Sequence, residues 1–181
     1  GTAAGTQVLA VNLAPTPTGA AVLAPVRFIA TAAAGAPAGL ALVAGGPIAT
    51  VRSGLLLETA IVVQLRDALN NDVPLAGIVV TVNVNNATVR GGSVPTDATG
   101  RAQFAGLRIN GIIGPRTLSF SASDATLAVP LAMPIALAAG LASQLAIVRG
   151  LPANVQSAAP VNPAPRVQLR DADGNDVPQS G

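Results

Sequence analysis

VQLRDALNNDVPLAG, at residues 63–77, decides how the fold is interpreted, because the chain contains this stretch almost twice. Residues 167–181 read VQLRDADGNDVPQSG, with eleven of fifteen positions identical at a constant offset of 104. Upstream, residues 38–54 match residues 143–158 at an offset of 105, so a single one-residue gap joins the two matches. Self-similarity at a fixed period indicates structural units in an array, and this period is the length of one small domain.

The repeat predicts three parts. Residues 36–138 form one complete unit, and residues 139–181 form the first part of a further unit. We expect residues 1–35 to be either the closing strands of a preceding unit or an N-terminal extension. GTQVLAVNL, at residues 5–13, starts with glycine and then alternates, as GPRTLSFSA does at residues 114–122. We therefore expect the chain to be a segment of a longer array, with the end of one unit, one complete unit and the beginning of a third.

The composition excludes several classes of function. Half of the residues are hydrophobic, only 10% are charged, and the chain contains no Cys, His, Trp or Tyr. All ten basic residues are Arg, scattered from Arg27 to Arg170, and the net charge is +2. A nucleic-acid surface needs clustered cations and stacking aromatics, whereas this chain has only three Phe. We therefore expect protein partners and no nucleic acid.

Two uncharged stretches, residues 28–51 and 125–148, are long enough to suggest membrane helices. Both are interrupted by Gly and Pro, including Pro134 and Gly140 in the second, and such residues disfavour a continuous helix. Both also lie where one unit would give way to the next. We expect extended segments with a break near residues 35–37 and near Gly140, and membrane association only indirectly, through a larger protein or complex.

Short alternating segments separated by turn residues predict strands rather than helices. We expect residues 38–137 to form an antiparallel sandwich of about seven strands, in which the strands on either side of ALNND pair as a hairpin. The turn-rich segments are ALNND (68–72), NNATVRGGS (85–93), TDATG (96–100) and NGIIGP (110–115). The predicted strands are IVVQLRD (61–67), GIVVTVNVN (77–85), RAQFAGLRI (101–109, with a local irregularity at Gly106) and RTLSFSA (116–122).

Alternation also predicts the core. One row of the strand at residues 77–85 is valine and the other is polar, so the valine row should face the interior. With so few aromatic residues the core must be mostly aliphatic and closely packed. The side chains expected in it are Val80, Val82, Val84, Ala102, Phe104, Leu107, Ile109, Leu118, Phe120 and Ala122.

VQLRDALNNDVP followed by VTVNV, TDATGRAQF and GPRTLSF resembles the bacterial immunoglobulin-like repeats of the invasin and intimin type. The resemblance departs from the family pattern at Leu69 and Asn70, where a Gly is usual, and residues 1–35 carry no family motif. It implies an all-β chain of immunoglobulin-like antiparallel β-sandwich repeats in tandem. It also implies an extracellular, cell-surface or periplasmic location, because such repeats resemble beads on surface and secreted proteins.

The candidate site residues are few. DADGND, at residues 171–176, gathers Asp171, Asp173 and Asp176 as in the start of a calcium loop, but Gly174 stands at the wrong position and no bidentate Glu follows. A tight turn is the favoured interpretation and calcium the weaker one. With no His or Cys, catalysis would need Asp or the lone Glu58, and no spacing marks such a pair. We expect no catalytic residue, no cofactor and no assigned metal.

Three functions are consistent with these observations. The first is a non-enzymatic spacer or stalk segment in a surface-exposed or secreted bacterial multi-domain protein. The second is an adhesive module that binds a partner through loops or sheet edges. The third is a scaffold or accessory subunit on a larger envelope assembly, such as a membrane complex or filament. The partners would be neighbouring repeats or subunits of that assembly.

Overall fold

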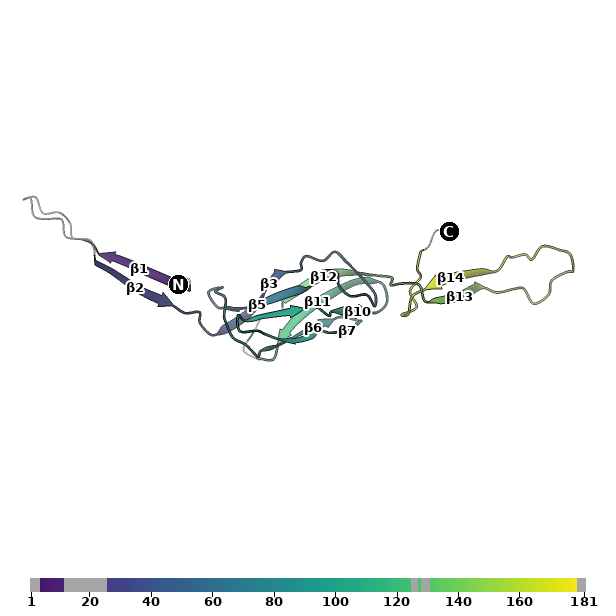
Figure 1. Ribbon diagram of the computed structural model, residues 1–181. Coiled ribbons are helices and arrows are strands. Elements are labelled where there is room, and N and C mark those ends of the chain that lie inside the picture. Colours follow the sequence, from purple (N-terminus) through teal and green to yellow (C-terminus); the bar gives the residue numbers. More distant parts are fainter. Residues whose placement is uncertain (1–3, 12–25, 125–126, 128–130, 179–181) are drawn as a thin grey trace, which may run out of the picture.

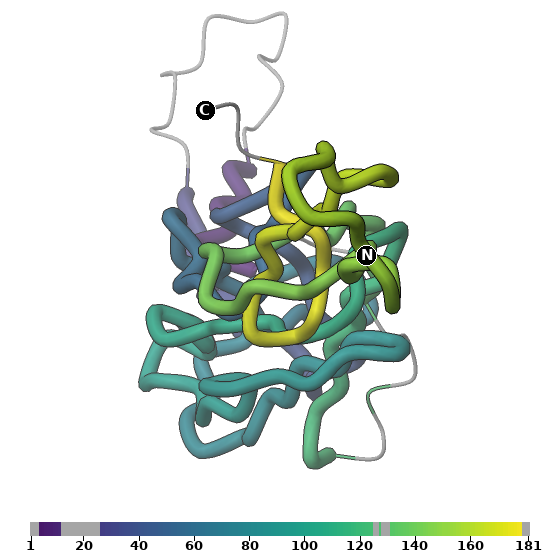
Figure 2. The backbone as a smooth tube through the Cα atoms, turned by 90° about the vertical axis from the view of Figure 1, so that its right-hand side faces the viewer, coloured from purple at the N-terminus to yellow at the C-terminus, as the bar shows by residue number. Residues whose placement is uncertain are grey.

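The computed structural model of the chain describes residues 4–11, 26–124, 127 and 131–178. Within these residues it contains β-strands and no helix. A sandwich occupies the middle of an elongated molecule, and a two-stranded hairpin projects from each end of it (Figure 1). The view along the long axis places the C-terminal hairpin in front of the sandwich (Figure 2). The fold is all-β, as the sequence predicted.

Ten strands build the central unit: β3 (Pro37–Ala44), β4 (Thr50–Arg52), β5 (Ile61–Asp67), β6 (Val79–Val84), β7 (Thr88–Arg90), β8 (Ser93–Pro95), β9 (Arg101–Phe104), β10 (Arg108–Asn110), β11 (Gly114–Ala122) and β12 (Leu131–Ala138). One sheet has the order β3-β5-β9 and the other has the order β4-β12-β11-β6-β8. A short β10-β7 ladder completes the unit. The pairs are antiparallel, except that β4 runs parallel to β12.

The parallel pair arises because the first strand of the unit divides between the two sheets. β3 pairs antiparallel with β5, and after residues 45–49 the chain continues in β4 beside β12. Backbone bonds from Ala136 N–H to the Ala49 carbonyl (3.0 Å) and from Ser53 N–H to the Ala138 carbonyl (2.9 Å) hold this edge. The first and last strands of the unit are thereby tied together.

The uncharged stretches are extended and broken, as predicted. The N-terminal hairpin consists of β1 (Gly5–Val11) and β2 (Val26–Ala32), and the C-terminal hairpin of β13 (Gln144–Arg149) and β14 (Arg166–Arg170). Each stretch therefore changes from one strand to another across a short connection, residues 33–36 in the first and 139–143 in the second. Residues 125–126 and 128–130 of the second stretch lie outside the described residues. Among the residues described, no helix has the length and apolarity needed to cross a membrane.

The prediction that the strands on either side of ALNND (68–72) pair as a hairpin is wrong. β5 pairs with β3 and β9 in one sheet, whereas β6 pairs with β11 and β8 in the other. Ile61, Val63 and Leu65 alternate along β5 and are fully buried, so this row needs an opposing sheet to cover it. The chain meets that need by crossing between the sheets after β5, which places the apolar row of β6 across the core.

Two further boundaries differ from the predictions. Residues 101–109 form two strands, β9 and β10, because residues 105–107 interrupt the ladder and allow Ile109 to pair opposite Val89. That pairing also makes a strand, β7, within residues 85–93, which were expected to be loop. The pairing of β7 with β10 has no local signal in the sequence, since the two short strands are about twenty residues apart.

The predicted core is confirmed for nearly every residue. Phe104 and Phe120 are fully buried and meet edge to face, with ring centroids 5.7 Å apart. Ala122, at the end of β11, is only half-buried. The other predicted core side chains are buried: Val80, Val82, Val84, Ala102, Leu107, Ile109 and Leu118.

We predict that Phe104→Ala lowers the free energy of unfolding by about 3–5 kcal/mol, because it removes a fully buried ring and its contact with Phe120. Denaturant unfolding measures the change. Ile112→Ala, at an exposed position, is the control and should change stability by less than about 0.5 kcal/mol. Similar losses in both variants would contradict the assigned core.

Candidate functional site

Asp67 organises the turn that follows β5. Its Oδ1 accepts hydrogen bonds from the backbone N–H of Leu69 (2.9 Å) and Asn71 (2.8 Å). Its Oδ2 accepts from Asn71 Nδ2 (2.9 Å) and from the backbone N–H of Gly35 (2.9 Å), which lies just before β3. One buried carboxylate therefore shapes its own turn and holds the segment that enters the unit.

Asp171 repeats this arrangement after β14. Its Oδ1 accepts from the backbone N–H of Asp173 (3.0 Å) and Asn175 (2.9 Å), and its Oδ2 from Asn175 Nδ2 and Gly140 N–H (both 2.8 Å). Asp171, Asn175 and Gly140 follow Asp67, Asn71 and Gly35 by 104, 104 and 105 residues, the offsets of the sequence repeat. The repeated sequence thus makes the same turn with the same partners.

The two copies of the repeat differ within the turn but keep its backbone conformation. Gly174 has φ of 84°, and Asn70, its counterpart in the first copy, has φ of 64°. Asparagine is one of the few residues with a side chain that tolerate this left-handed region. Asn70 therefore takes the place that Gly174 has in the second copy, with equivalent hydrogen bonds around Asp67 and Asp171.

The hydrogen bonds lower the pKa of both carboxyl groups. The Asn71 side chain, followed by the backbone N–H of Gly35, lowers the pKa of Asp67 to about 2. Burial by itself raises the pKa of Asp171, but the hydrogen bonds from Asn175, Gly140 and Asp173 outweigh it, so this pKa is also lowered. Both groups are charged at neutral pH, and the charge strengthens the bonds that hold the turns.

The second turn also docks onto the central unit. Asn175 Oδ1 accepts the backbone N–H of Ile113 (2.9 Å), and its Nδ2 donates to the Gly111 carbonyl (2.9 Å). The Ser53 hydroxyl donates to the carboxylate of Asp173 and accepts the N–H of Gly111 at 3.0 Å. We call this contact the C-terminal joint; it comprises Ser53, Gly111, Ile113, Gly140, Asp171, Asp173 and Asn175.

Gly140 leaves no space for a side chain within the C-terminal joint. A Cβ atom added there would lie 2.4 Å from the Ser53 carbonyl oxygen, closer than any real contact. The chain needs this approach for the Gly140 N–H to reach Asp171. The glycine therefore permits the unit and the turn to meet directly.

The first turn makes a corresponding contact at the other end. Asn71 Oδ1 accepts the backbone N–H of Ala4 (2.8 Å), the residue before β1, as Asn175 Oδ1 accepts that of Ile113, the residue before β11. We call this contact the N-terminal joint; it comprises Ala4, Gly35, Asp67 and Asn71. Each joint thus ties a hairpin to the sandwich through an Asp and an Asn four residues apart.

The hairpins share the strand register of the central unit. In the N-terminal hairpin Gly5 is opposite Ala32, as Gly114 is opposite Leu137 in the β11–β12 pair. In the C-terminal hairpin Leu145 is opposite Leu169, as Leu40 is opposite Leu65 in the β3–β5 pair. The β13–β14 and β3–β5 pairs also shift register at matching positions, after Ile147 and Leu42. β1–β2 is therefore equivalent to β11–β12, and β13–β14 to β3–β5.

The three candidate calcium ligands each have a different partner. Asp171 accepts from four N–H groups, Asp173 accepts from Ser53, and Asp176 forms an exposed ion pair with Arg170 at 2.9 Å. No group of three His, Cys, Asp or Glu side chains arranged to hold a metal occurs among the residues described. These contacts favour the structural interpretation of the carboxylates, and calcium binding stays a prediction that chelation tests.

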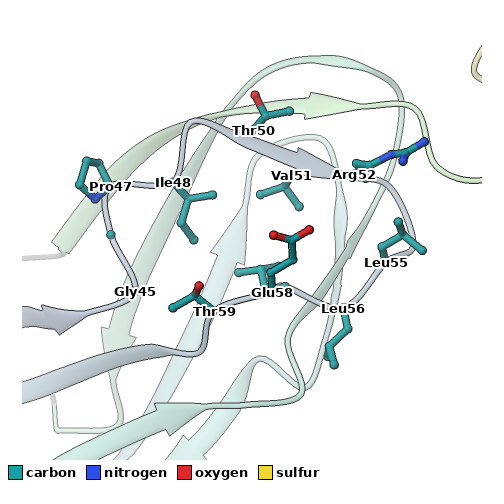
Figure 3. Close-up of a pocket in the computed structure, with 12 residues that line it drawn as sticks. Gly45, Pro47, Ile48, Thr50, Val51, Arg52, Leu55, Leu56, Glu58 and Thr59 are labelled. Atoms are coloured by element: carbon teal, nitrogen blue, oxygen red, sulfur yellow. The ribbon is translucent and has the colours of Figure 1, made fainter. Parts of the chain in front are cut away.

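Glu58 lines a cavity of about 620 Å³ among the loops beside β4. Figure 3 shows its carboxylate directed toward Val51, with Ile48 also pointing inward, while Thr50 points away. Arg52 points out of the cavity and donates to the carbonyls of Ala139 and Gly140 (both 3.2 Å). The lining offers one carboxylate among mostly apolar side chains and no paired acid and base.

Sequence reasoning identified the aspartates as turn formers but missed the joints. Asn71 and Asn175 are identical in the two copies and stand at the same place in the turn, which was an available signal. Ser53 and the backbone groups of Gly111 and Ile113 had none, because they are far away in sequence and lie outside the second repeat.

The comparison with protein families accounts for the central unit. A family model described as SMCHD1 Ig-like domain 6 matches residues 35–133, which is more than half of the chain. The chain belongs to this family of Ig-like domains. The matched residues run from just before β3 into β12 and so cover both facing sheets. The expected immunoglobulin-like sandwich is therefore confirmed.

The comparison with solved structures also found matches. InvD of Yersinia pseudotuberculosis is 21% identical with a TM-score of 0.49, over 98% of this chain and 53% of that one. A β-glycosidase from Bacteroides vulgatus is 16% identical with a TM-score of 0.39, over 74% of this chain and 21% of that one. The chain thus spans about half the length of the first structure and about a fifth of the second. The comparison with curated proteins found no match.

We predict that acid weakens the unit partly through Asp67. Because its pKa is lowered to about 2 in the fold, its contribution is complete above about pH 4 and is lost as the pH falls through about 2. Asp67→Asn should therefore be less stable than the wild type at pH 7, and the difference should shrink at pH 2. Urea unfolding as a function of pH measures it. A difference that stays constant with pH would refute this role of the charge.

We predict that chelation leaves the melting temperature unchanged, because each of the three candidate carboxylates already accepts a hydrogen bond or forms an ion pair. Thermal unfolding in EDTA and in millimolar calcium measures this. Asp176→Asn serves as the comparison, since it removes one carboxylate without touching the joint. A calcium-dependent shift of several degrees that this variant abolishes would establish a metal site.

Proposed function

We propose that the chain is a non-enzymatic spacer segment of a surface-exposed or secreted bacterial protein built from Ig-like repeats of the invasin and intimin type. In this scheme residues 36–138 are one complete unit, residues 1–35 carry the closing strands of a preceding unit, and residues 139–181 begin a further unit. The location would be extracellular, cell-surface or periplasmic. The partners would be neighbouring repeats or subunits of a larger assembly.

The observation that carries this proposal is the recurrence of the joint. A spacer must hold consecutive units in a fixed orientation, which requires direct contacts rather than a free linker. At each end an Asp fixes its turn while the Asn four residues later bonds the residue before a neighbouring strand: Ala4 at one end and Ile113 at the other. The same geometry at both ends supports a chain of units joined in one repeated way.

The connections are short as well as bonded. Four residues separate β2 from β3, and five separate β12 from β13. Within each connection the Asp carboxylate accepts the N–H of a glycine, Gly35 or Gly140. A connection of this kind restricts bending more than a polar linker of similar length would. Stiffness and reach then constitute the function, and no chemistry is needed.

An interaction module is the second candidate, because large apolar side chains are exposed on both hairpins. Exposed apolar patches of this kind mark interaction sites. The two proposals are compatible, since a stiff segment can also present a binding surface.

We predict that Asn175→Ala loosens the C-terminal hairpin relative to the sandwich. The chain has no cysteine, so spin labels at Gln103→Cys and Ser157→Cys would report one distance across the C-terminal joint. Double electron–electron resonance should give a narrow distance distribution in the parent protein. The distribution should broaden at least about twofold in the variant, because the bonds to Gly111 and Ile113 are lost.

Asn71→Ala is the matched control, since it removes the equivalent side chain at the N-terminal joint. It should leave the distribution across the C-terminal joint unchanged. Amide exchange of β14 would show that the hairpin stays folded in Asn175→Ala. A parent distribution that is already broad would overturn the spacer proposal.

A further inference from the structure

The cavity beside β4 belongs to the central unit. Its lining residues all lie between residues 45 and 59, on β4 and on the loops before and after it, and none of them belongs to a hairpin. Figure 3 shows the hollow between β4 and residues 55–59, the segment that leads toward β5. Its volume of about 620 Å³ lies within the range of ligand sites, about 300–1,000 Å³. We call it the β4 cavity.

Glu58 brings a charge to the β4 cavity that no cation of the described residues pairs with. It is the only Glu of the chain and is exposed, and its carboxylate is directed toward Val51 (Figure 3). Both ion pairs in the described part of the chain join other residues. Arg52, the arginine closest to it in sequence, donates instead to two carbonyls after β12. The cavity is therefore electrostatically suited to a cation.

The walls of the β4 cavity select the kind of cation. They are mostly apolar and include Ile48, Val51, Leu55 and Leu57. An alkyl stem that carries a charged head packs on such walls, and lysine combines a flexible stem with a compact ammonium. An ammonium has more donors than one carboxylate uses, and the hydroxyl of Thr59, directed to the same side as the Glu58 carboxylate in Figure 3, supplies a further acceptor.

β4 also has an unpaired edge. It is the last strand of its sheet and has β12 on one side only. The bonds to β12 use Ala49 and Ser53 and, by the alternation of a parallel ladder, Val51 between them. The N–H groups of Thr50 and Arg52 therefore point away from β12. An edge of this kind can pair with an extended segment of another chain.

The second copy of this segment lacks the carboxylate. Gly54 and Ala158 are separated by the repeat offset of 104, and both have positive φ, of 74° and 61°, so the two copies turn at the same place. At that offset Glu58 corresponds to Asn162, and residues 150–165 contain no acidic residue. The repeated fold therefore does not require a carboxylate here, whereas both copies keep the Asp of the turn after the next strand. Glu58 distinguishes the central unit from its repeat.

We infer that the β4 cavity binds a lysine side chain of a partner protein, presented by an extended segment that pairs with the free edge of β4. The ammonium bonds Glu58 and Thr59, and the alkyl stem lies against the apolar walls. The sequence contains no lysine, so another copy of these residues does not supply this group. The inference is independent of the spacer proposal, because every residue that it uses lies within the central unit.

The test titrates the whole chain with the peptide Val-Thr-Lys-Thr-Val, blocked at both ends, whose alternation places Lys and both Val on one face. Amide shifts of the isotope-labelled protein report the place and the strength of binding. The amides of Thr50, Arg52 and Glu58 should shift together. A peptide with norleucine in place of Lys keeps an alkyl stem without the ammonium. It should bind at least about tenfold more weakly, because it cannot bond the carboxylate.

Glu58→Gln keeps the size of the side chain and removes its charge. It should weaken binding of the lysine peptide at least about tenfold and abolish its advantage over the norleucine peptide. Because Glu58 is exposed, the melting temperature of the variant should be unchanged, which verifies that the fold persists. Asp176→Asn is the matched control, since it removes the same charge at an exposed position outside the cavity, and it should bind as the wild type does.

Peptides methylated on alternate backbone nitrogens test the edge of β4. Methylation of the N–H groups that face β4 should abolish binding, whereas methylation of the other set should preserve it. Equal binding of the two methylated peptides, undiminished binding to Glu58→Gln, an arginine peptide that binds as tightly as the lysine peptide, or no binding at millimolar peptide would each overturn the inference. The spacer proposal would survive these results, because it depends on the distance distributions across the joints.

Discussion

A buried aspartate that accepts four N–H groups is the constraint on which the chain depends. In the unfolded chain water can bond the carboxylate of Asp67, but in the fold the protein must supply those donors itself. Two of them come from the backbone of the turn, one from the Asn71 side chain and one from Gly35. Local turn geometry and contact with the entering segment are therefore satisfied together.

The constraint extends from the turn to the sandwich. Because Asp67 ends β5 and fixes the direction of the chain after it, the next strand is delivered to the opposite sheet. The β5 row of Ile61, Val63 and Leu65 is then covered by the row of β6. A polar turn at the edge of the unit and an apolar core at its centre are consequences of the same path.

The features of the fold that depend only on neighbouring residues in the sequence could be predicted. The alternation in residues 77–85 placed Val80, Val82 and Val84 inside, because side-chain direction in a strand follows from position alone. The strand at residues 61–67 was also predicted with its observed bounds. Strand partners were beyond this reasoning: β5 and β6 are adjacent in sequence, yet their sheets are chosen by the packing of the whole unit.

The two aspartate turns and their joints divide in the same way into features that the sequence predicts and features that it does not. The repeated aspartates predicted two turns of one kind, and the structure gives both of them the same bonds. What those turns touch could not be predicted, since Ser53 has no distinguishing pattern and Gly111 contributes only backbone atoms. The apolar residues of RVQLR (166–170) likewise predicted an apolar face on this strand, and Val167 is 65% exposed in the structure.

The parallel pairing of β4 with β12 bears on how the unit responds to force. The chain enters through β3 and β4 and leaves through β12, so tension on the two ends pulls β4 and β12 in opposite directions along their lengths. The bonds from Ala136 to Ala49 and from Ser53 to Ala138 lie across this direction and are loaded in shear, all at once. A ladder pulled from one end would instead open one bond at a time. The strand that divides between the sheets thus acts as a mechanical clamp between the points where the unit is held.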